Sequence, residues 1–304
     1  MTVPAFNYLK PDSLAEALDM LATEPGAYPI AGGTNLMVDV RAGKLSPETM
    51  IDVGDLDELR GIVVKDSQMT IGGAVTIAEL LRHEIIRQRV PVLFAAGKTF
   101  ANTLIRNRAT VGGNLVNAAP CSDTAPALLV LDAEVSLSSS SGTRWIPLTE
   151  FLVGAFQTQR RADELLMEVR FPIPPASSRG GFEKMGLRKI SCMAKVDVAV
   201  MADFDERGAC KDARIALGAV APIPLRAEKA EASLVGTAFI ARAPEKPVRC
   251  GEQVQDKTIE EAARLAGEAA SPRSGSEYKR QVVYGLTRRI LTAMATGIRD
   301  GEAS

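Results

Sequence analysis

The sequence predicts an α+β protein with a two-part first domain and a smaller α+β second domain. The first part alternates strand and helix signals, and hairpin signals begin near residue 60. After a linker rich in Pro, Ser and Gly at 172–181, strands come first and helices last. A chain of 304 residues has room for about two domains. We expect a first domain at 1–176, divided into 1–58 and 59–176, a second at 177–290, and a tail at 291–304.

The first subdomain has the signals of a small βαβ unit. A capping box, Ser13 with Glu16, precedes a helix with apolar residues at helical spacing. Residues 28–31 then predict a strand, 36–41 a short helix and 50–53 another strand. This order favours a parallel sheet for the subdomain.

The second subdomain has hairpin signals and apolar helices. Residues 62–64 and 69–71 flank a polar turn, and 135–137 and 145–148 enclose the Ser-rich turn at 138–143. Residues 76–79 contain a second capping box, and residues 92–101 and 125–131 are apolar segments. We therefore expect a mixed or antiparallel sheet with helices.

The second domain is predicted from strands followed by helices. Residues 196–200 and 213–217 alternate as strands on either side of a turn at 205–208. Two helices are expected near 259–270 and 277–295. This order is typical of an α+β domain.

Charge and hydropathy exclude two classes of partner. Basic residues number 36 and acidic residues 37, so the net charge of −1 creates no global field that attracts nucleic acid. No run of about 18 uncharged apolar residues predicts a membrane span. The first residues lack the pattern of a signal peptide, and the cysteines are expected to be free, so we expect a cytoplasmic protein.

Histidine and cysteine are scarce. His83 is the single histidine, and we expect it at the end of a helix as a C-cap cation. The four cysteines form no CxxC, which argues against a zinc or iron–sulfur site built by this chain alone. Cys192, Cys210 and Cys250 are expected to be small buried residues.

Three Gly-Gly pairs are expected to follow apolar strands, at 32–33, 72–73 and 112–113. Successive amide N–H groups in such turns can bind an anion. The first and third pairs continue into small polar residues, which favours a nucleotide ligand, although tight turns are the alternative. The second pair leads into a capped helix and is expected to be structural. No GxGxxG occurs, and Val92 stands where a P-loop ending at 97–99 would need glycine.

Two segments resemble the FAD pyrophosphate loops of the flavin subunits of molybdenum hydroxylases. Residues 31–36 (AGGTNL) resemble the first loop and residues 105–115 (IRNRATVGGNL) the second. Residues 118–123 (AAPCSD) then match the small-Pro-x-x-Asp continuation of the family. The resemblance runs from about Phe6 to Arg289. The family includes the medium subunit of carbon monoxide dehydrogenase and the FAD subunit or domain of xanthine dehydrogenase.

The resemblance implies a two-part FAD-binding domain, a smaller C-terminal domain and a set of cofactor contacts. The implied contacts are Pro29, Ile30, Ala31, Gly32, Gly33, Thr34, Asn35, Leu36, Thr110, Gly112, Gly113, Asn114, Asp123, Leu166 and Lys184. Leu166 could instead be only a core residue, and Lys184 only a solvated surface lysine. The chain lacks the Cys-rich insertion that holds an extra cluster in some relatives. Met193 falls where relatives place a flavin-shielding Tyr or Ile.

The implied function is electron transfer through non-covalent FAD. A large subunit would carry the molybdenum cofactor, and a small subunit would carry two [2Fe–2S] clusters. This chain would pass the electrons to NAD, quinone or another acceptor, in a dimer of heterotrimers. Residues 105–107, with Arg106 beside an exposed Ile105, are the expected docking surface. A stand-alone FAD oxidase and a regulatory nucleotide-binding module are the alternatives.

Overall fold

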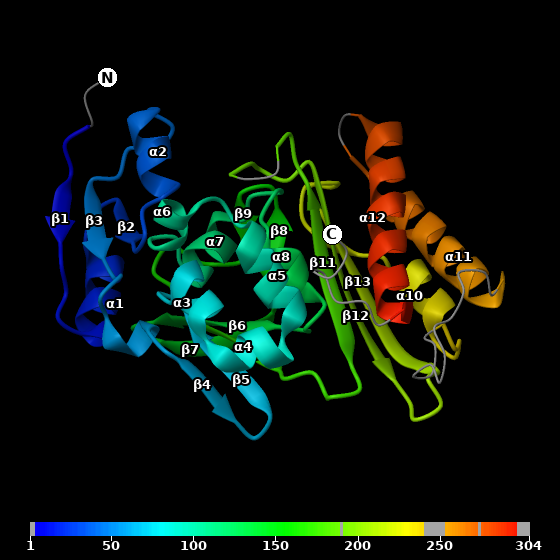
Figure 1. Ribbon diagram of the computed structural model, residues 1–304. Helices are drawn as coiled ribbons and strands as arrows, with labels where there is room; N and C mark the ends of the chain where they lie inside the picture. The colour runs from blue at the N-terminus through cyan, green and yellow to red at the C-terminus, as the bar shows by residue number, and fades with distance from the viewer. Residues whose placement is uncertain (1–3, 189–190, 240–252, 273–274, 297–304) are drawn as a thin grey trace. The chain divides into compact units, whose positions relative to one another are not determined.

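The computed structural model describes residues 4–188, 191–239, 253–272 and 275–296 (Figure 1). The chain forms two compact units, each made of three separate segments. Unit 1 comprises Met1–Glu84, Phe100–Ala119 and Asp132–Ile173. Unit 2 comprises Ile85–Thr99, Pro120–Leu131 and Pro174–Ser304. The domain limits expected from the sequence stay a prediction.

Unit 1 begins with a three-stranded parallel sheet. Its strands are β1 (Asn7–Leu9), β2 (Ala27–Ile30) and β3 (Thr49–Asp52), in the order β1-β3-β2. Helix α1 (Leu14–Thr23) joins β1 to β2, and α2 (Leu36–Arg41) lies between β2 and β3. The predicted βαβ unit is confirmed.

The capping box predicted for α1 forms in part. The Ser13 hydroxyl accepts the N–H of Glu16 at 3.3 Å, but the Glu16 carboxylate accepts the N–H of Asp12. The apolar face of the helix, with Ala17 and Leu18, is buried in a hydrophobic cluster. Burial of a side chain the size of leucine stabilises a fold by about 1.5–3 kcal/mol, so this face holds α1 against the sheet.

A five-stranded antiparallel sheet forms the second part of unit 1. Its order is β4 (Ile62–Lys65), β5 (Gln68–Gly72), β10 (Leu165–Pro172), β6 (Glu134–Ser139) and β7 (Gly142–Pro147). Both predicted hairpins are confirmed. The central strand β10 comes from a distant part of the chain and joins the two hairpins into one sheet.

The remaining elements of unit 1 are short. They are η1 (Asp57–Leu59), α3 (Ile77–Arg82), α6 (Thr103–Arg106), α7 (Val111–Asn117), α9 (Leu148–Phe151), β8 (Leu152–Gly154) and β9 (Gln157–Thr158). Thr76 and Glu79 form the complete capping box predicted for α3, and His83 is the C-cap of this helix, as predicted.

Unit 2 contains a four-stranded antiparallel sheet with helices on both faces (Figure 1). The strands are β11 (Arg179–Met185), β12 (Val196–Phe204), β13 (Cys210–Gly218) and β14 (Leu225–Arg226), in sequence order. The helices are α4 (Glu84–Arg89), α5 (Pro91–Thr99), α8 (Thr124–Leu129), α10 (Glu228–Leu234), α11 (Gln253–Ala269) and α12 (Ser276–Thr296). Helices α10, α11 and α12 cover one face, and α5 and α8 the other.

Strand β12 is buried on both faces of this sheet. Val196, Val198 and Val200 belong to the cluster that contains residues of α10, α11 and α12. The intervening residues Asp197 and Ala199 point to the other face, because neighbouring residues of a strand alternate.

The linker expected at 172–181 is shorter than predicted. Strand β10 continues to Pro172, and β11 begins at Arg179. Gly180 belongs to the ladder with β12, and a Cβ there would lie 2.2 Å from the sulfur of Met201. Glycine here leaves room for the side chain of Met201 on the neighbouring strand.

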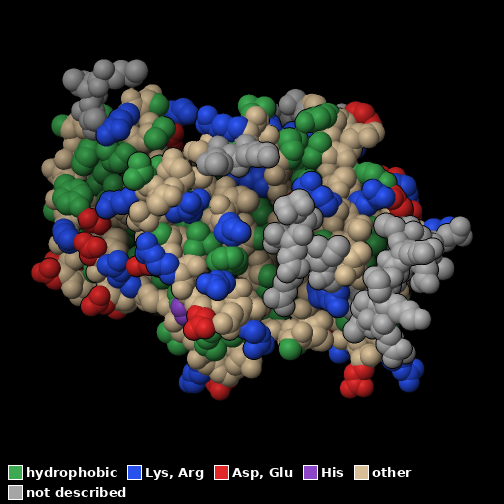
Figure 2. Space-filling view, in the orientation of Figure 1, with side chains coloured by type: hydrophobic (Ala, Val, Ile, Leu, Met, Phe, Trp, Pro, Cys, Tyr) green, Lys and Arg blue, Asp and Glu red, His purple; other side chains and the backbone are tan. Residues whose placement is uncertain are grey.

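The described surface carries charges of both signs (Figure 2), and the cysteines differ in burial. In the part that the structure describes, no helix is long and apolar enough to cross a membrane. Lys and Arg side chains lie at separate points across the face in Figure 2, with Asp and Glu also present on it. Cys210 is buried as predicted, but Cys192 is only partly buried. Cys250 lies outside the described residues.

Candidate functional site

The first glycine loop leaves β2 after Ile30 and enters α2 at Leu36. Gly33 has φ +66°, a left-handed conformation that glycine adopts without steric cost. In the described part of the chain, the backbone N–H groups of residues 32–35 donate no hydrogen bond. Four adjacent amides without acceptors form a concavity suited to an anion, and the loop is partly accessible to solvent.

Gly32 brings this loop against the backbone that precedes α7. A Cβ at Gly32 would lie 1.8 Å from the carbonyl oxygen of Arg108 and 2.6 Å from its carbonyl carbon. No side chain fits at that distance, so position 32 requires glycine for packing. The two predicted loops of unit 1 are therefore in direct backbone contact.

The second glycine pair differs from its prediction. Gly112 and Gly113 lie in the first turn of α7, and no strand precedes them. The N–H of Gly113 bonds to the Thr110 hydroxyl at 3.1 Å, and the N–H of Gly112 bonds to the Gly73 carbonyl at 2.9 Å. Val111 donates its N–H to Val75 at 2.9 Å. Since these amides already have acceptors, this turn can form a wall of a site but not a second nest of free amides.

Gly73, Gly112 and Leu166 form a close backbone stack in unit 1. A Cβ at Gly112 would lie 2.7 Å from the Gly73 oxygen, and a Cβ at Gly73 would lie 2.3 Å from the Leu166 oxygen. The structural role predicted for the pair at 72–73 is thus confirmed. The side chain of Leu166 is buried in β10.

Asp123 and Lys184 form a buried ion pair in unit 2. The Lys184 Nζ lies 2.7 Å from Asp123 Oδ2 and also donates to the Thr99 carbonyl at 3.2 Å. The side chains of Lys184 and Asp123 are 5% and 7% exposed, so Lys184 is not a solvated surface lysine. Burial raises the pKa of Asp123 to about 6, against the opposing effect of Lys184. The pair is therefore ionised at neutral pH.

Asp123 retains one acceptor for a ligand. Its Oδ1 is buried and has no hydrogen-bond partner among the described residues. Buried polar atoms usually have partners, and a missing partner points to a bound group. A hydroxyl group would satisfy this oxygen.

The structure brings the predicted site residues together in two sets. Unit 1 contains residues 29–36, Thr110, Gly112, Gly113, Asn114 and Leu166. Asp123 and Lys184 belong to unit 2 and are paired there although they lie 61 residues apart in sequence.

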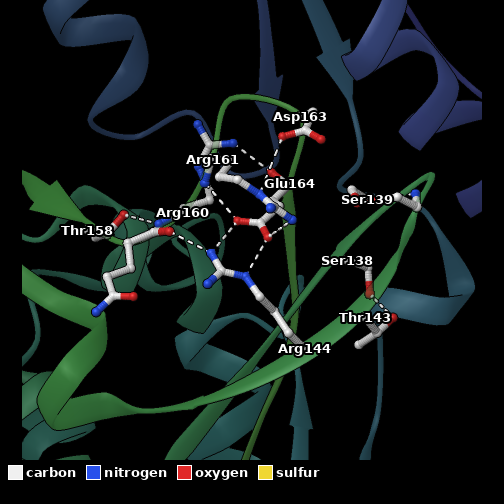
Figure 3. Close-up of polar contacts among 11 residues, drawn as sticks. Ser138, Ser139, Thr143, Arg144, Thr158, Arg160, Arg161, Asp163 and Glu164 are labelled. Atoms are coloured by element: carbon white, nitrogen blue, oxygen red, sulfur yellow. Dashed lines mark hydrogen bonds and ion pairs between the residues drawn. The ribbon is translucent and has the colours of Figure 1, made fainter.

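A charged cluster that sequence reasoning missed precedes Leu166 (Figure 3). Glu164, whose side chain is 1% exposed, accepts two bonds from Arg144 at 2.7 and 2.8 Å and one from the Arg161 N–H at 2.7 Å. Burial alone would raise the pKa of Glu164, but these donors outweigh it and hold the pKa below its usual range. Arg160 donates to the Glu164 carbonyl at 2.6 Å. These contacts hold the start of β10.

Asp197 is the second feature that was missed. It is fully buried in β12, and neither carboxyl oxygen has a hydrogen-bond partner in the described part of the chain. The available signal was an aspartate within the apolar segment at 196–200.

Two family models match the chain. FAD binding domain in molybdopterin dehydrogenase matches residues 4–174, and the CO dehydrogenase flavoprotein C-terminal domain matches residues 181–249.

Known proteins are similar over nearly the whole chain. The carbon monoxide dehydrogenase medium chain of Afipia carboxidovorans is 31% identical, over 94% of this chain and 95% of that protein. The putative xanthine dehydrogenase FAD-binding subunit of Escherichia coli is 28% identical, over 94% of each. A solved carbon monoxide dehydrogenase from Hydrogenophaga pseudoflava matches with a TM-score of 0.87 and 29% identity, covering 97% of this chain and 98% of that chain.

These matches show the family of the chain and agree with the predicted α+β architecture. The chain belongs to the FAD-binding medium subunits of the molybdenum hydroxylase family. It is therefore an oxidoreductase subunit of the xanthine dehydrogenase and carbon monoxide dehydrogenase type.

Proposed function

We propose that this chain binds FAD non-covalently and transfers electrons from the [2Fe–2S] clusters of a small subunit to NAD, quinone or another acceptor. A large subunit would carry the molybdenum cofactor, and the complex would be a dimer of heterotrimers. The observation that carries the proposal is the set of four amides without acceptors at residues 32–35. Relatives named as medium chains of carbon monoxide dehydrogenase support the multi-subunit assembly.

Each unit offers donors or acceptors of the kind that FAD requires. The amides of residues 32–35 would hold the pyrophosphate, and residues 110–114 would form the opposite wall. The free Oδ1 of Asp123 would accept a hydroxyl, and Lys184 would keep the Asp123 carboxylate oriented. Bound FAD supplies the redox chemistry, while this chain supplies binding, orientation and charge.

The test of cofactor binding begins with the purified chain. Flavin absorption bands and saturable FAD binding support the proposal, and the absence of binding contradicts it. Acid precipitation should release all the flavin, because His83 lies at the end of α3 and not in a glycine loop. Flavin that stays with the pellet would favour the alternative, an oxidase with covalently attached FAD.

The electron path requires the co-purified complex. We expect substrate to reduce FAD only when the partner subunits are present, as an electron-transfer subunit requires. Reduction by substrate in the isolated chain would support a stand-alone oxidase instead. A panel of purines, N-heterocycles, aldehydes and carbon monoxide, each with NAD or a quinone, identifies substrate and acceptor. The cytoplasmic location predicted from the cysteines stays a prediction.

The docking surface expected at 105–107 needs revision. Ile105 is partly buried rather than exposed, and the exposed apolar side chain of α6 is Leu104, at 79%. The Arg106 guanidinium donates to the Phe100 carbonyl at 2.8 Å and so has a local structural role. A reversed charge at Arg106 would disturb this bond as well as any docking.

We therefore expect Leu104→Glu to weaken assembly with the small subunit while FAD stays bound, because it places a charge on an apolar contact. Val63→Glu, at another exposed apolar residue of unit 1, is the matched control. The yield of the co-purified complex is the measurement. An equal yield for Leu104→Glu and wild type would mean that docking uses another surface.

A further inference from the structure

A buried row of three residues crosses the sheet of unit 2. Lys184 of β11 lies opposite Asp197 of β12, and Asp197 lies opposite Gly218 of β13. Residues directly opposite in antiparallel strands share a face and have Cβ atoms about 4.5–5.5 Å apart. Asp197 is therefore next to the lysine that pairs with Asp123.

Gly218 provides the space for the Asp197 side chain. A Cβ at position 218 would lie 1.9 Å from Asp197 Oδ1 and 2.8 Å from Cγ of Pro126 in α8. The carboxyl group therefore fills the volume between β13 and α8. It has 0% exposure, so water cannot solvate a charge there.

The charges around Asp197 do not balance if both carboxyl groups are ionised. The charged groups that act on it are Lys184 from β11 and Asp123 from the start of α8; the Gly218 amide of β13 also favours the ionised form but does not reach hydrogen-bond geometry. Lys184 is already held by Asp123 and by the Thr99 carbonyl of α5. Burial raises the pKa of Asp197 well above its usual value. The negative charge of Asp123 raises this pKa further, and the positive charge of Lys184 lowers it. The nearby Cys121 thiol also has a raised pKa, mainly from burial, and stays neutral.

We propose that Asp197 is a positioning residue for the Asp123–Lys184 pair. While its carboxyl group is neutral, Lys184 stays paired with Asp123. When the group is ionised, it competes with Asp123 for the lysine. The effect on the cofactor rests on the proposed function, because Asp123 and Lys184 are proposed FAD contacts. The affinity for FAD should then depend on the proton of Asp197.

The first test needs no cofactor. The unfolded aspartate loses its proton near pH 4, while the folded one keeps it, so rising pH favours unfolding. Asp197→Asn removes this effect. Near pH 4 the two proteins should have the same equilibrium constant of unfolding. Above pH 5 the constant of Asp197→Asn should fall below that of wild type by a further factor of about ten per pH unit, until the pH reaches the pKa of folded Asp197.

Chemical denaturation from pH 4 to 9 measures this difference. Glu206→Gln, at an exposed carboxylate in the turn after β12, is the control and should show no such divergence. A constant offset between wild type and Asp197→Asn over the whole range would overturn the inference that Asp197 is neutral.

The second test is the Kd of FAD between pH 7 and 9, above the range in which Asp123 takes up its proton. We expect the wild-type Kd to rise by about tenfold once the pH passes the point at which the stability difference from Asp197→Asn stops growing, because Asp197 ionises there. The Kd of Asp197→Asn should stay constant, because asparagine cannot ionise. Equal pH profiles would overturn the positioning role. If wild type binds no FAD at all while the stability curves diverge, the proposed function fails and the neutral state of Asp197 stands.

Gly218→Ala offers a separate perturbation. Its methyl group would push the Asp197 carboxyl out of its space, and FAD should bind about tenfold more weakly at pH 7. The double variant with Asp197→Ala should restore binding, since it removes the displaced carboxyl group. A folded Gly218→Ala protein with normal FAD affinity would contradict the inference, and Asp197→Asn remains decisive if that variant does not fold.

Discussion

Gly32→Ala tests whether the contact between the two loops of unit 1 shapes the FAD site. The φ of Gly32 is outside the left-handed region, so the substitution adds a methyl group with no backbone strain. That methyl group would lie 1.8 Å from the Arg108 carbonyl oxygen. Both partners are backbone, so no side-chain rotation relieves the clash. The loop at residues 32–35 must therefore move away from residue 108.

The displacement determines the size of the effect. To reach an ordinary contact, the loop must move by roughly 1 Å or more. A hydrogen bond stretched by about 1 Å from its normal length of 2.9 Å is lost. Each bond from an amide to a charged phosphate contributes about 1.5–3 kcal/mol, so loss of two of the four proposed bonds costs at least about 3 kcal/mol. The Kd of FAD should rise by about 100-fold or more.

Titration of the purified apoprotein with FAD, followed by flavin fluorescence, measures this Kd. Circular dichroism and urea unfolding check that Gly32→Ala is folded. Gly285→Ala, in helix α12 of unit 2, is the control, because a Cβ at Gly285 meets nothing within 4 Å and its φ is outside the left-handed region. A folded Gly32→Ala protein with wild-type affinity would refute both the clash and the proposed pyrophosphate loop.

Three other predictions use separate features. Gly33 and Gly43 have φ of +66° and +68°, so alanine at either position should lower the free energy of unfolding in urea by about 1–2 kcal/mol. Only Gly33→Ala should also weaken FAD binding in titrations. Lys184→Met leaves Asp123 as an unpaired buried charge, so the free energy of unfolding should fall by about 3–5 kcal/mol at pH 8. The loss should be smaller at pH 5, where Asp123 takes up a proton, and equal losses at the two pH values would contradict the ion pair. Glu164→Gln should cost about 2 kcal/mol at pH 7. The cost should shrink as the pH falls below the ordinary pKa of glutamate, because the unfolded chain then takes up the proton before folded Glu164 does, and a pH-independent cost would rule out an ionised Glu164.

The sequence by itself determined the local elements and the conformation of one glycine loop. Short helix α2 begins and ends where predicted, at Leu36 and Arg41, and both hairpins form around their polar turns. Thr76 caps α3 as its spacing with Glu79 indicates. Hydrophobic periodicity, caps and turn residues act between near neighbours, so the order of residues is enough to predict them. The glycine loop at residues 32–35 belongs to this class in part, because Gly33 adopts its left-handed φ locally, whereas the contact of Gly32 with Arg108 is tertiary.

Tertiary structure decided the rest. Strand β10 pairs between β5 and β6, and its apolar residues give no sign of which distant strands it will join. Gly112 was predicted as part of an anion loop, but its amide bonds to Gly73, and glycine is needed there because two backbones meet. The Asp123–Lys184 pair and the neutral state proposed for Asp197 depend on burial among α5, α8 and the sheet of unit 2. Burial and long-range pairing set the cost of each charge, and they exist only after distant segments have packed.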